Sequence, residues 1–182
     1  FGDLRPEHVS PAIDQLIADC KSTIAALEAP AAPATWDAFV APLEDCTERL
    51  ARAWSIVGHL NAVADTPELR AAYNENLPRV TEFWTALAQN LALYSKYKAL
   101  RAAPAFAGLN AARRKTIENA LRDFRLGGAE LPEDEKPRFA EIQEEQAAAS
   151  QKFSENVLDA TNAWSLHLED GSRLAGVPDD VQ

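Results

Sequence analysis

The sequence predicts an all-α fold: an array of about five or six mostly antiparallel helices, with a short strand near the C-terminus that has no partner strand. Three observations lead to this prediction. Apolar residues recur at spacings of three and four over several long segments, which is the pattern of helices that each bury one face. Proline and glycine residues interrupt the chain between these segments. Near the C-terminus the period changes to two, which is typical of a strand.

The first helix is predicted to begin at Ser10 and Pro11, because serine favours the N-cap position and proline the first helical turn. It ends near Glu28, before a connection at residues 29–34 whose two prolines prevent helical geometry. One face of this helix is apolar for about five turns, through Ile13, Leu16, Ile17, Cys20, Ile24 and Leu27.

A turn and a longer helix are predicted next. Thr35 caps the turn around Trp36 and Phe39, and Pro42 suits the first position of the helix that follows. Residues spaced by threes and fours then define the buried face of that helix, namely Leu43, Cys46, Leu50, Ala53, Trp54, Val57 and Leu60.

The third predicted helix starts at Asp65 or Thr66, just before Pro67. Its apolar face continues so far along the chain that Pro78 is expected to lie inside the helix and bend it instead of ending it. The residues of this face are Leu69, Tyr73, Leu77, Val80, Trp84, Leu87, Leu91 and Tyr94.

Two more helices complete the array. After a break at residues 102–108, Asn110 is a suitable N-cap for a helix that Gly127 and Gly128 end. The last helix begins around residues 132–137, and one of its faces is predicted to turn toward the core. That face carries Phe139, Ile142, Gln146, Ala149, Phe153, Val157, Ala160 and Trp164.

The short strand is predicted at residues 165–169, where Leu166 and Leu168 alternate with polar residues. A single strand leaves its backbone donors and acceptors unpaired, so its partner strand is expected further along the polypeptide. Residues 177–179 read as the start of another helix. We therefore expect residues 1–182 to be the N-terminal helical part of a longer polypeptide, with the partner strand and the rest of the protein C-terminal to it.

Composition excludes several classes of function. The 182 residues are 47% hydrophobic, which is ample for a packed core. The net charge of -10 and the pI near 4.8 argue against nucleic acid or an anionic membrane surface as a partner, because both carry negative charge. The sequence has no apolar run of about 18 residues and no secretory leader pattern at its N-terminus. A cytoplasmic location is the default expectation.

No catalytic, cofactor-binding or metal-ligating residue is predicted in this chain. Cys20 and Cys46 each lie on an apolar helical face and read as buried hydrophobic residues, with a disulfide or a metal site as the alternatives. None of His8, His59 and His167 is followed by glutamate, so the zinc motif H-E-x-x-H is absent. His59 either ends a helix or faces a substrate channel.

Charged residues gather in two places. The acidic cluster lies beside Lys136 and Arg138 and reads as a solvated face, because acid–base carboxylates need burial and a partner. The basic cluster reads as surface pairing with Glu118, or as a docking surface for an acidic domain or for peptide C-termini. The acidic cluster is Glu130, Glu133, Asp134, Glu135, Glu141, Glu144 and Glu145; the basic cluster is Arg113, Arg114, Lys115, Arg122 and Arg125.

Four segments carry a resemblance to a known family. They are FSENVLDATNAW at 153–164, NALRDF at 119–124, HLN at 59–61 and PELR at 67–70. With these segments, the chain closely resembles the N-terminal helical region of the oligopeptidase A branch of the thimet oligopeptidase family of zinc metallopeptidases. The resemblance extends over the whole length of the chain.

The resemblance implies a cytosolic zinc metallopeptidase that cleaves oligopeptides and cleaved signal peptides in a deep channel. The segment would form part of the channel wall, and the zinc would be held by the missing C-terminal domain. The family's zinc site needs two histidines one helical turn apart, a third carboxylate ligand and a general base, none of which matches a position here. The rival hypothesis is a stand-alone helical module that binds a partner helix along a groove.

Overall fold

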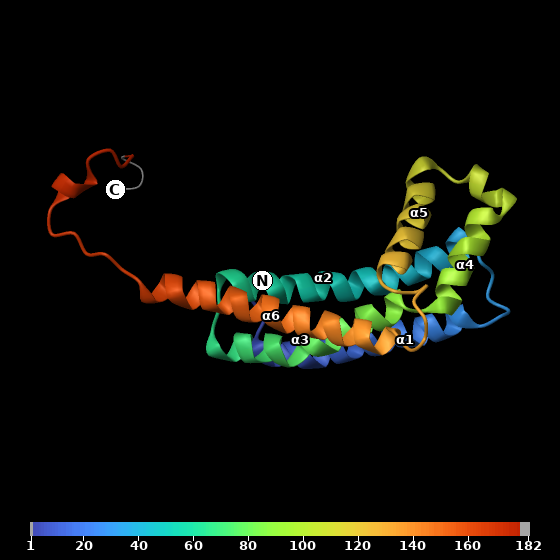
Figure 1. The fold of residues 1–182 in the computed structure, drawn as a ribbon, viewed down its shortest axis with the longest axis horizontal. Helices are drawn as coiled ribbons and strands as arrows, with labels where there is room; N and C mark the ends of the chain where they lie inside the picture. Colours follow the sequence, from blue (N-terminus) through green and yellow to red (C-terminus); the bar gives the residue numbers. More distant parts are fainter. Residues whose placement is uncertain (1, 179–182) are drawn as a thin grey trace. The chain divides into compact units, whose positions relative to one another are not determined.

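The computed structural model describes residues 2–178, and within this range it contains six α-helices and no strand. The predicted all-α fold is therefore confirmed (Figure 1). The helices are α1 (Val9–Glu28), α2 (Ala41–Val63), α3 (Pro67–Ala88), α4 (Leu91–Ala102), α5 (Ala111–Leu126) and α6 (Lys136–Ala163). Short helical turns are η1 (Pro6–His8), η2 (Trp36–Val40), η3 (Pro104–Gly108) and η4 (Gly171–Leu174).

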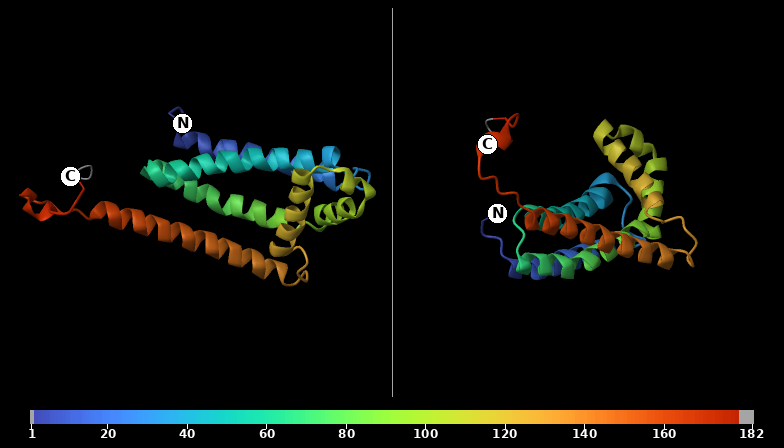
Figure 2. Two further views of the ribbon diagram at one scale, coloured as in Figure 1. Left: turned by 90° about the horizontal axis from the view of Figure 1, so that it is seen from above. Right: turned by 60° about the vertical axis from the view of Figure 1, so that its left-hand side comes forward.

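The chain divides into two compact units, one ending at Ala148 and the other beginning at Ala149. In the first unit α1, α2 and α3 lie side by side, with α2 antiparallel to both α1 and α3, and all three pairs are in contact (Figures 1 and 2). The shorter helices α4 and α5 pack against each other at one end of these three helices and run across them (Figure 1). The second unit holds the end of α6, an irregular stretch and η4.

Side-chain caps fix several helix starts. A hydroxyl or amide oxygen accepts a backbone N–H bond at the start of each of four helical segments, which satisfies a donor that has no partner within the helix. The predicted caps at Thr35, Thr66 and Asn110 are confirmed. The bonds are Ala38 N–H to Thr35 (3.3 Å), Leu69 N–H to Thr66 (3.2 Å), Leu93 N–H to Asn90 (3.0 Å) and Arg113 N–H to Asn110 (2.9 Å).

Two helix boundaries differ from the prediction. The long face from Leu69 to Tyr94 belongs to two helices, because the Asn90 side chain caps a new helix where the pattern of apolar spacing continues unbroken. Pro78 does lie inside α3, as predicted. The first helix begins at Val9, directly after η1, so Ser10 is inside it and is not its N-cap.

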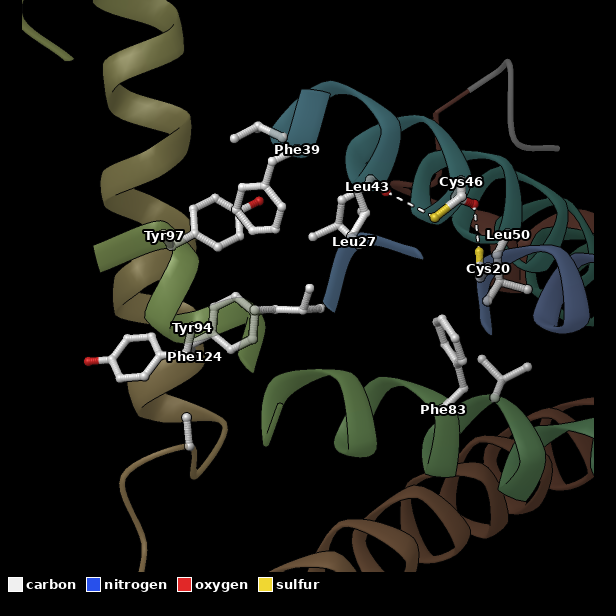
Figure 3. Close-up of a cluster of buried hydrophobic side chains, with 14 of the residues drawn as sticks. Cys20, Leu27, Phe39, Leu43, Cys46, Leu50, Phe83, Tyr94, Tyr97 and Phe124 are labelled. Atoms are coloured by element: carbon white, nitrogen blue, oxygen red, sulfur yellow. Dashed lines mark hydrogen bonds between the residues drawn. The ribbon is translucent and has the colours of Figure 1, made fainter. Parts of the chain in front are cut away.

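The core lies where α2, α4 and α5 meet and continues between α1, α2 and α3 (Figure 3). Phe39 and Tyr97 pack edge to face with ring centroids 4.8 Å apart, and the Tyr97 ring also lies 5.6 Å from that of Phe124. The most deeply buried side chains are Tyr97, Phe39, Ile13, Leu50, Leu93, Ile117, Val40, Asn76 and Cys20.

A polar connection joins α1 to α3 inside this apolar setting. Asn76 is 0% exposed, and its amide nitrogen donates to the Ser10 hydroxyl at 2.8 Å and to the Ala72 carbonyl at 2.8 Å. Its amide oxygen accepts from the Arg79 guanidinium at 2.9 Å, and Arg79 also pairs with Asp14 of α1. Because each buried polar atom of Asn76 has a partner, the residue fixes the register of the two helices.

Two glycines end α5. The Ala129 N–H bonds to the Phe124 carbonyl at 2.9 Å and the Gly128 N–H to the Arg125 carbonyl at 3.2 Å, the two bonds of a Schellman motif. Gly128 has a φ of 93°, a conformation that side chains with a Cβ disfavour. At Gly127 a Cβ would lie 2.4 Å from the Ala88 Cβ, so glycine allows the end of α5 to approach the end of α3.

We expect Gly128→Ala to lower the free energy of unfolding by about 1–2 kcal/mol, the cost of a left-handed backbone for a residue with a Cβ. The added Cβ would also meet a Leu131 methyl carbon at 2.9 Å. Urea denaturation followed by circular dichroism measures the change. Gly108→Ala is the control, because nothing lies within 4 Å of its Cβ position. Equal effects of the two substitutions on the free energy of unfolding would contradict the left-handed conformation of Gly128.

The predicted strand is not formed. Residues 164–168 have no regular secondary structure, because within residues 2–178 no second strand is present to pair with their backbone groups. The helix start predicted at residues 177–179 falls outside helical structure at Val177, and from Asp179 onward it lies outside the described residues.

The prediction that the apolar face of the last helix turns toward the core is wrong. The side chains of that face are exposed on α6: Ile142 by 44%, Phe153 by 70% and Val157 by 50%, and Trp164 just beyond the helix by 72%. Among the described residues of α6, Lys136 is the buried one. A helical period shows that one face is apolar, but it does not show which other surface covers that face.

Candidate functional site: a hollow bounded by four helices

A candidate site in the first unit is a hollow of about 320 Å³ bounded by four helices. Its walls are mostly apolar, and they come together because α4 and α5 pack across the ends of α2 and α3. Its lining consists of Leu43, Glu44 and Thr47 of α2, Trp84, Leu87 and Ala88 of α3, Tyr97 of α4, and Ala120, Asp123 and Phe124 of α5.

The charged groups of the hollow are two carboxylates. Partial desolvation raises the pKa of Glu44, and among the described residues its carboxylate makes no hydrogen bond or ion pair. Asp123 accepts a bond from the Arg122 Nε at 2.9 Å. Burial, followed by the nearby charge of Glu44, raises the pKa of Tyr97, so this phenol stays protonated.

Chemically, the hollow suits an apolar group that ends in a positive charge, because aromatic walls and a carboxylate both attract cations. It does not suit catalysis. The Thr47 hydroxyl donates to the Leu43 carbonyl at 2.8 Å, and no imidazole lines the hollow to activate it as a nucleophile.

The histidines lie on separate elements. His8 precedes α1 and accepts the Arg5 N–H through its Nδ1 at 3.2 Å, His59 lies exposed near the end of α2, and His167 lies exposed in the irregular stretch after α6. Within residues 2–178, no group of three or more histidine, cysteine or carboxylate side chains is arranged to hold a metal ion. The side chains present therefore do not fit a zinc site.

The acidic cluster is joined to basic side chains at several points. Glu130 accepts from the Tyr94 hydroxyl at 2.5 Å and pairs with Arg125 at 3.3 Å. The Tyr94 bond, followed by the charge of Arg125, lowers the pKa of Glu130. Glu133 pairs with Lys136 at 2.5 Å. Arg138 pairs with Glu141 at 3.0 Å and Glu145 at 3.3 Å. Apart from Lys136, whose side chain is nearly buried, these pairs lie on a solvated surface, and the bond between Tyr94 and Glu130 joins the connection after α5 to α4.

The basic cluster also pairs on the surface, but with partners other than those predicted. Glu118 pairs with Arg101 of α4 at 3.7 Å, and Arg122 pairs with Asp123 at 2.8 Å. Arg113 lies 4.9 Å from the Trp36 ring centroid and 3.9 Å from Asp37. Spacing within one helix cannot identify a partner on another helix, which explains the difference.

Both cysteines are buried and free, as predicted. The Cys20 thiol donates to the Cys46 carbonyl at 3.0 Å, and the Cys46 thiol donates to the Leu43 carbonyl at 3.2 Å (Figure 3). They join α1 to α2 as small buried hydrophobic residues with weak hydrogen bonds.

Sequence reasoning did not find the hollow. Of the residues that line it, Leu43, Trp84 and Leu87 were predicted on the apolar faces of two separate helices, and no pattern in the sequence indicates that the helices leave space where they meet. The one feature of the sequence that could have indicated the hollow is Glu44, a charged residue that directly follows Leu43 of the apolar face of α2.

No helix among residues 2–178 is both long and apolar enough to cross a bilayer.

Comparison with known proteins assigns the chain to a family. Residues 13–136 match the family described as Neurolysin/Thimet oligopeptidase, N-terminal domain. The chain is 43% identical to oligopeptidase A of Haemophilus influenzae over 182 residues, covering 100% of this chain and 26% of that protein. It is 40% identical to oligopeptidase A of Escherichia coli (100% and 27%), and 36% identical to the probable cytosolic oligopeptidase A of Arabidopsis thaliana (98% and 25%).

The chain thus spans about a quarter of the length of these relatives. Its matched residues take in α2 to α5 entirely and most of α1, which are the helices that form the core and the hollow. The chain therefore belongs to the neurolysin and thimet oligopeptidase family, and it corresponds to the N-terminal domain of that family.

Proposed function

We propose that this chain is the non-catalytic N-terminal helical domain of a zinc-dependent peptidase that hydrolyses short peptides. The observation that carries the proposal is the match of the whole chain to oligopeptidase A, at about 40% identity, over about a quarter of the relatives' length. We further propose that the complete protein is cytoplasmic and that a C-terminal catalytic domain supplies the zinc, its ligands and the general base. The side chains of residues 2–178 do not fit a zinc site, and this supports that division.

The proposed role of these helices is steric. A wall of packed helices beside the reaction centre admits short unfolded peptides and excludes folded proteins, so it determines which substrates reach the zinc. The closely packed core of α1 to α5 supports this role, because deeply buried aromatic residues and a fully bonded Asn76 favour a rigid wall.

The test compares the 182-residue chain with the complete protein, using a quenched fluorescent peptide in the presence of zinc. We expect the complete protein to hydrolyse the peptide, a chelator to abolish the hydrolysis, and the 182-residue chain to show none. A folded protein containing the same cleavable sequence in its core should remain intact. Chelator-sensitive hydrolysis by the 182-residue chain would refute the assignment of the chemistry to the other domain, and an inactive complete protein would refute the peptidase proposal itself.

A further inference from the structure

The second unit carries an apolar face that its own residues leave exposed. Phe153 and Val157 lie one turn apart on α6, and Trp164 continues the same face just beyond the last helical turn. Phe153 is 70% exposed, Val157 50%, Trp164 72% and the nearby Leu166 57%. We call Phe153, Val157 and Trp164 the α6 apolar face. Large side chains gathered in this way on a helix mark an interaction surface.

Polar groups around this face are already satisfied. The Thr161 hydroxyl donates to the Val157 carbonyl at 2.8 Å, and the Ser154 hydroxyl donates to the Ser150 carbonyl at 3.1 Å. The free energy of binding a partner would therefore come from burying apolar area, and the partner needs no specific hydrogen bond with these hydroxyls. A single amphipathic helix is marginal in water unless its apolar face is packed, so α6 gains stability from such a partner.

We propose that the α6 apolar face docks against the remaining part of the longer polypeptide to which this chain corresponds, an inference that rests on the proposed function. The relatives match this chain over its full length and are nearly four times as long, so most of such a protein lies outside these residues. The exposed side chains of the face indicate the chemistry of the docking surface, because an apolar surface complements them.

Hydrogen–deuterium exchange of residues 149–168 tests the proposal, measured in the 182-residue chain and in the complete protein. We expect these amides to exchange at least about tenfold more slowly in the complete protein, because docking suppresses local opening. Phe153→Glu in the complete protein should return them to the exchange rate of the 182-residue chain. Asn162→Glu is the matched control, since nine residues place it about half a turn around the helix from Phe153.

If Phe153→Glu prevents the complete protein from folding, the milder Phe153→Ala replaces it and should give a smaller increase in exchange. Equal exchange in the short chain and the complete protein, or equal effects of Phe153→Glu and Asn162→Glu, would overturn the proposal. So would a dimer of the 182-residue chain that Phe153→Glu dissociates in sedimentation velocity, because the occupant would then be a second copy. The exchange readout does not depend on hydrolysis, so protection of α6 in an inactive complete protein would refute the proposed function alone.

Discussion

Phe39→Ala is expected to lower the free energy of unfolding by about 3–5 kcal/mol, the range for removing a fully buried aromatic side chain. Phe39 is 0% exposed and its ring packs edge to face on Tyr97 with centroids 4.8 Å apart. Truncation therefore removes apolar burial and leaves a cavity beside a rigid ring that cannot collapse into it. Urea denaturation followed by far-ultraviolet circular dichroism gives the change, with the slope of the transition unchanged.

The same substitution at Phe153 is the control for this result. Phe153 is 70% exposed, so Phe153→Ala in the 182-residue chain should change the free energy of unfolding by no more than about 0.5 kcal/mol. A loss at Phe39 as small as the loss at Phe153 would mean that η2 does not pack against α4 as the structure describes.

The Cys20 thiol is expected to react with iodoacetamide about a thousandfold more slowly in the native chain at pH 8 than in denaturant. Burial, followed by the influence of Cys46, raises the pKa of Cys20 from 9.0 to about 12. Each unit of this rise reduces the reactive thiolate tenfold below the pKa. Cys46→Ala isolates the Cys20 signal, and it keeps the backbone carbonyl that accepts the Cys20 S–H.

The same pKa shift predicts how stability depends on pH. The native state retains the Cys20 proton to a higher pH than the unfolded chain does, so folding is favoured below the ordinary pKa of 9.0. The free energy of unfolding therefore falls as the pH rises from 9.0 toward 12, a slope that Cys20→Ala should reduce. In the alkylation experiment, reaction rates of Cys20 with iodoacetamide that agree within a factor of ten between the native and the denatured chain would show that the thiol is not buried as described.

The helix starts illustrate how far the sequence alone reaches. Thr35, Thr66 and Asn110 cap their helices as predicted, because a short polar side chain at an N-cap bonds within its own turn. The glycine pair after α5 was also recognisable, since a left-handed helix end is a local requirement. Asn90 has the same local function, but it was missed because the apolar spacing passes through it without interruption.

Contacts between helices were not predictable in the same way. No pattern in the sequence marks Asn76, yet its partners Ser10 and Arg79 make it a fully buried link between α1 and α3. Glu118 was paired by spacing with arginines on its own helix, and it bonds instead to Arg101 of α4. The hollow beside Glu44 likewise depends on how four helices meet.

By itself, the sequence determined that this protein is all helical and where most of its helices begin and end, because caps, breaks and apolar periods act within a few residues. The matching segments of the sequence also indicated the family to which it belongs. The tertiary structure alone decided which apolar faces are buried. Leu50 and Phe153 both lie on predicted apolar helical faces, but Leu50 is buried in α2 and Phe153 is exposed on α6. Burial depends on the surfaces that surround a face, and a helical period carries no information about them.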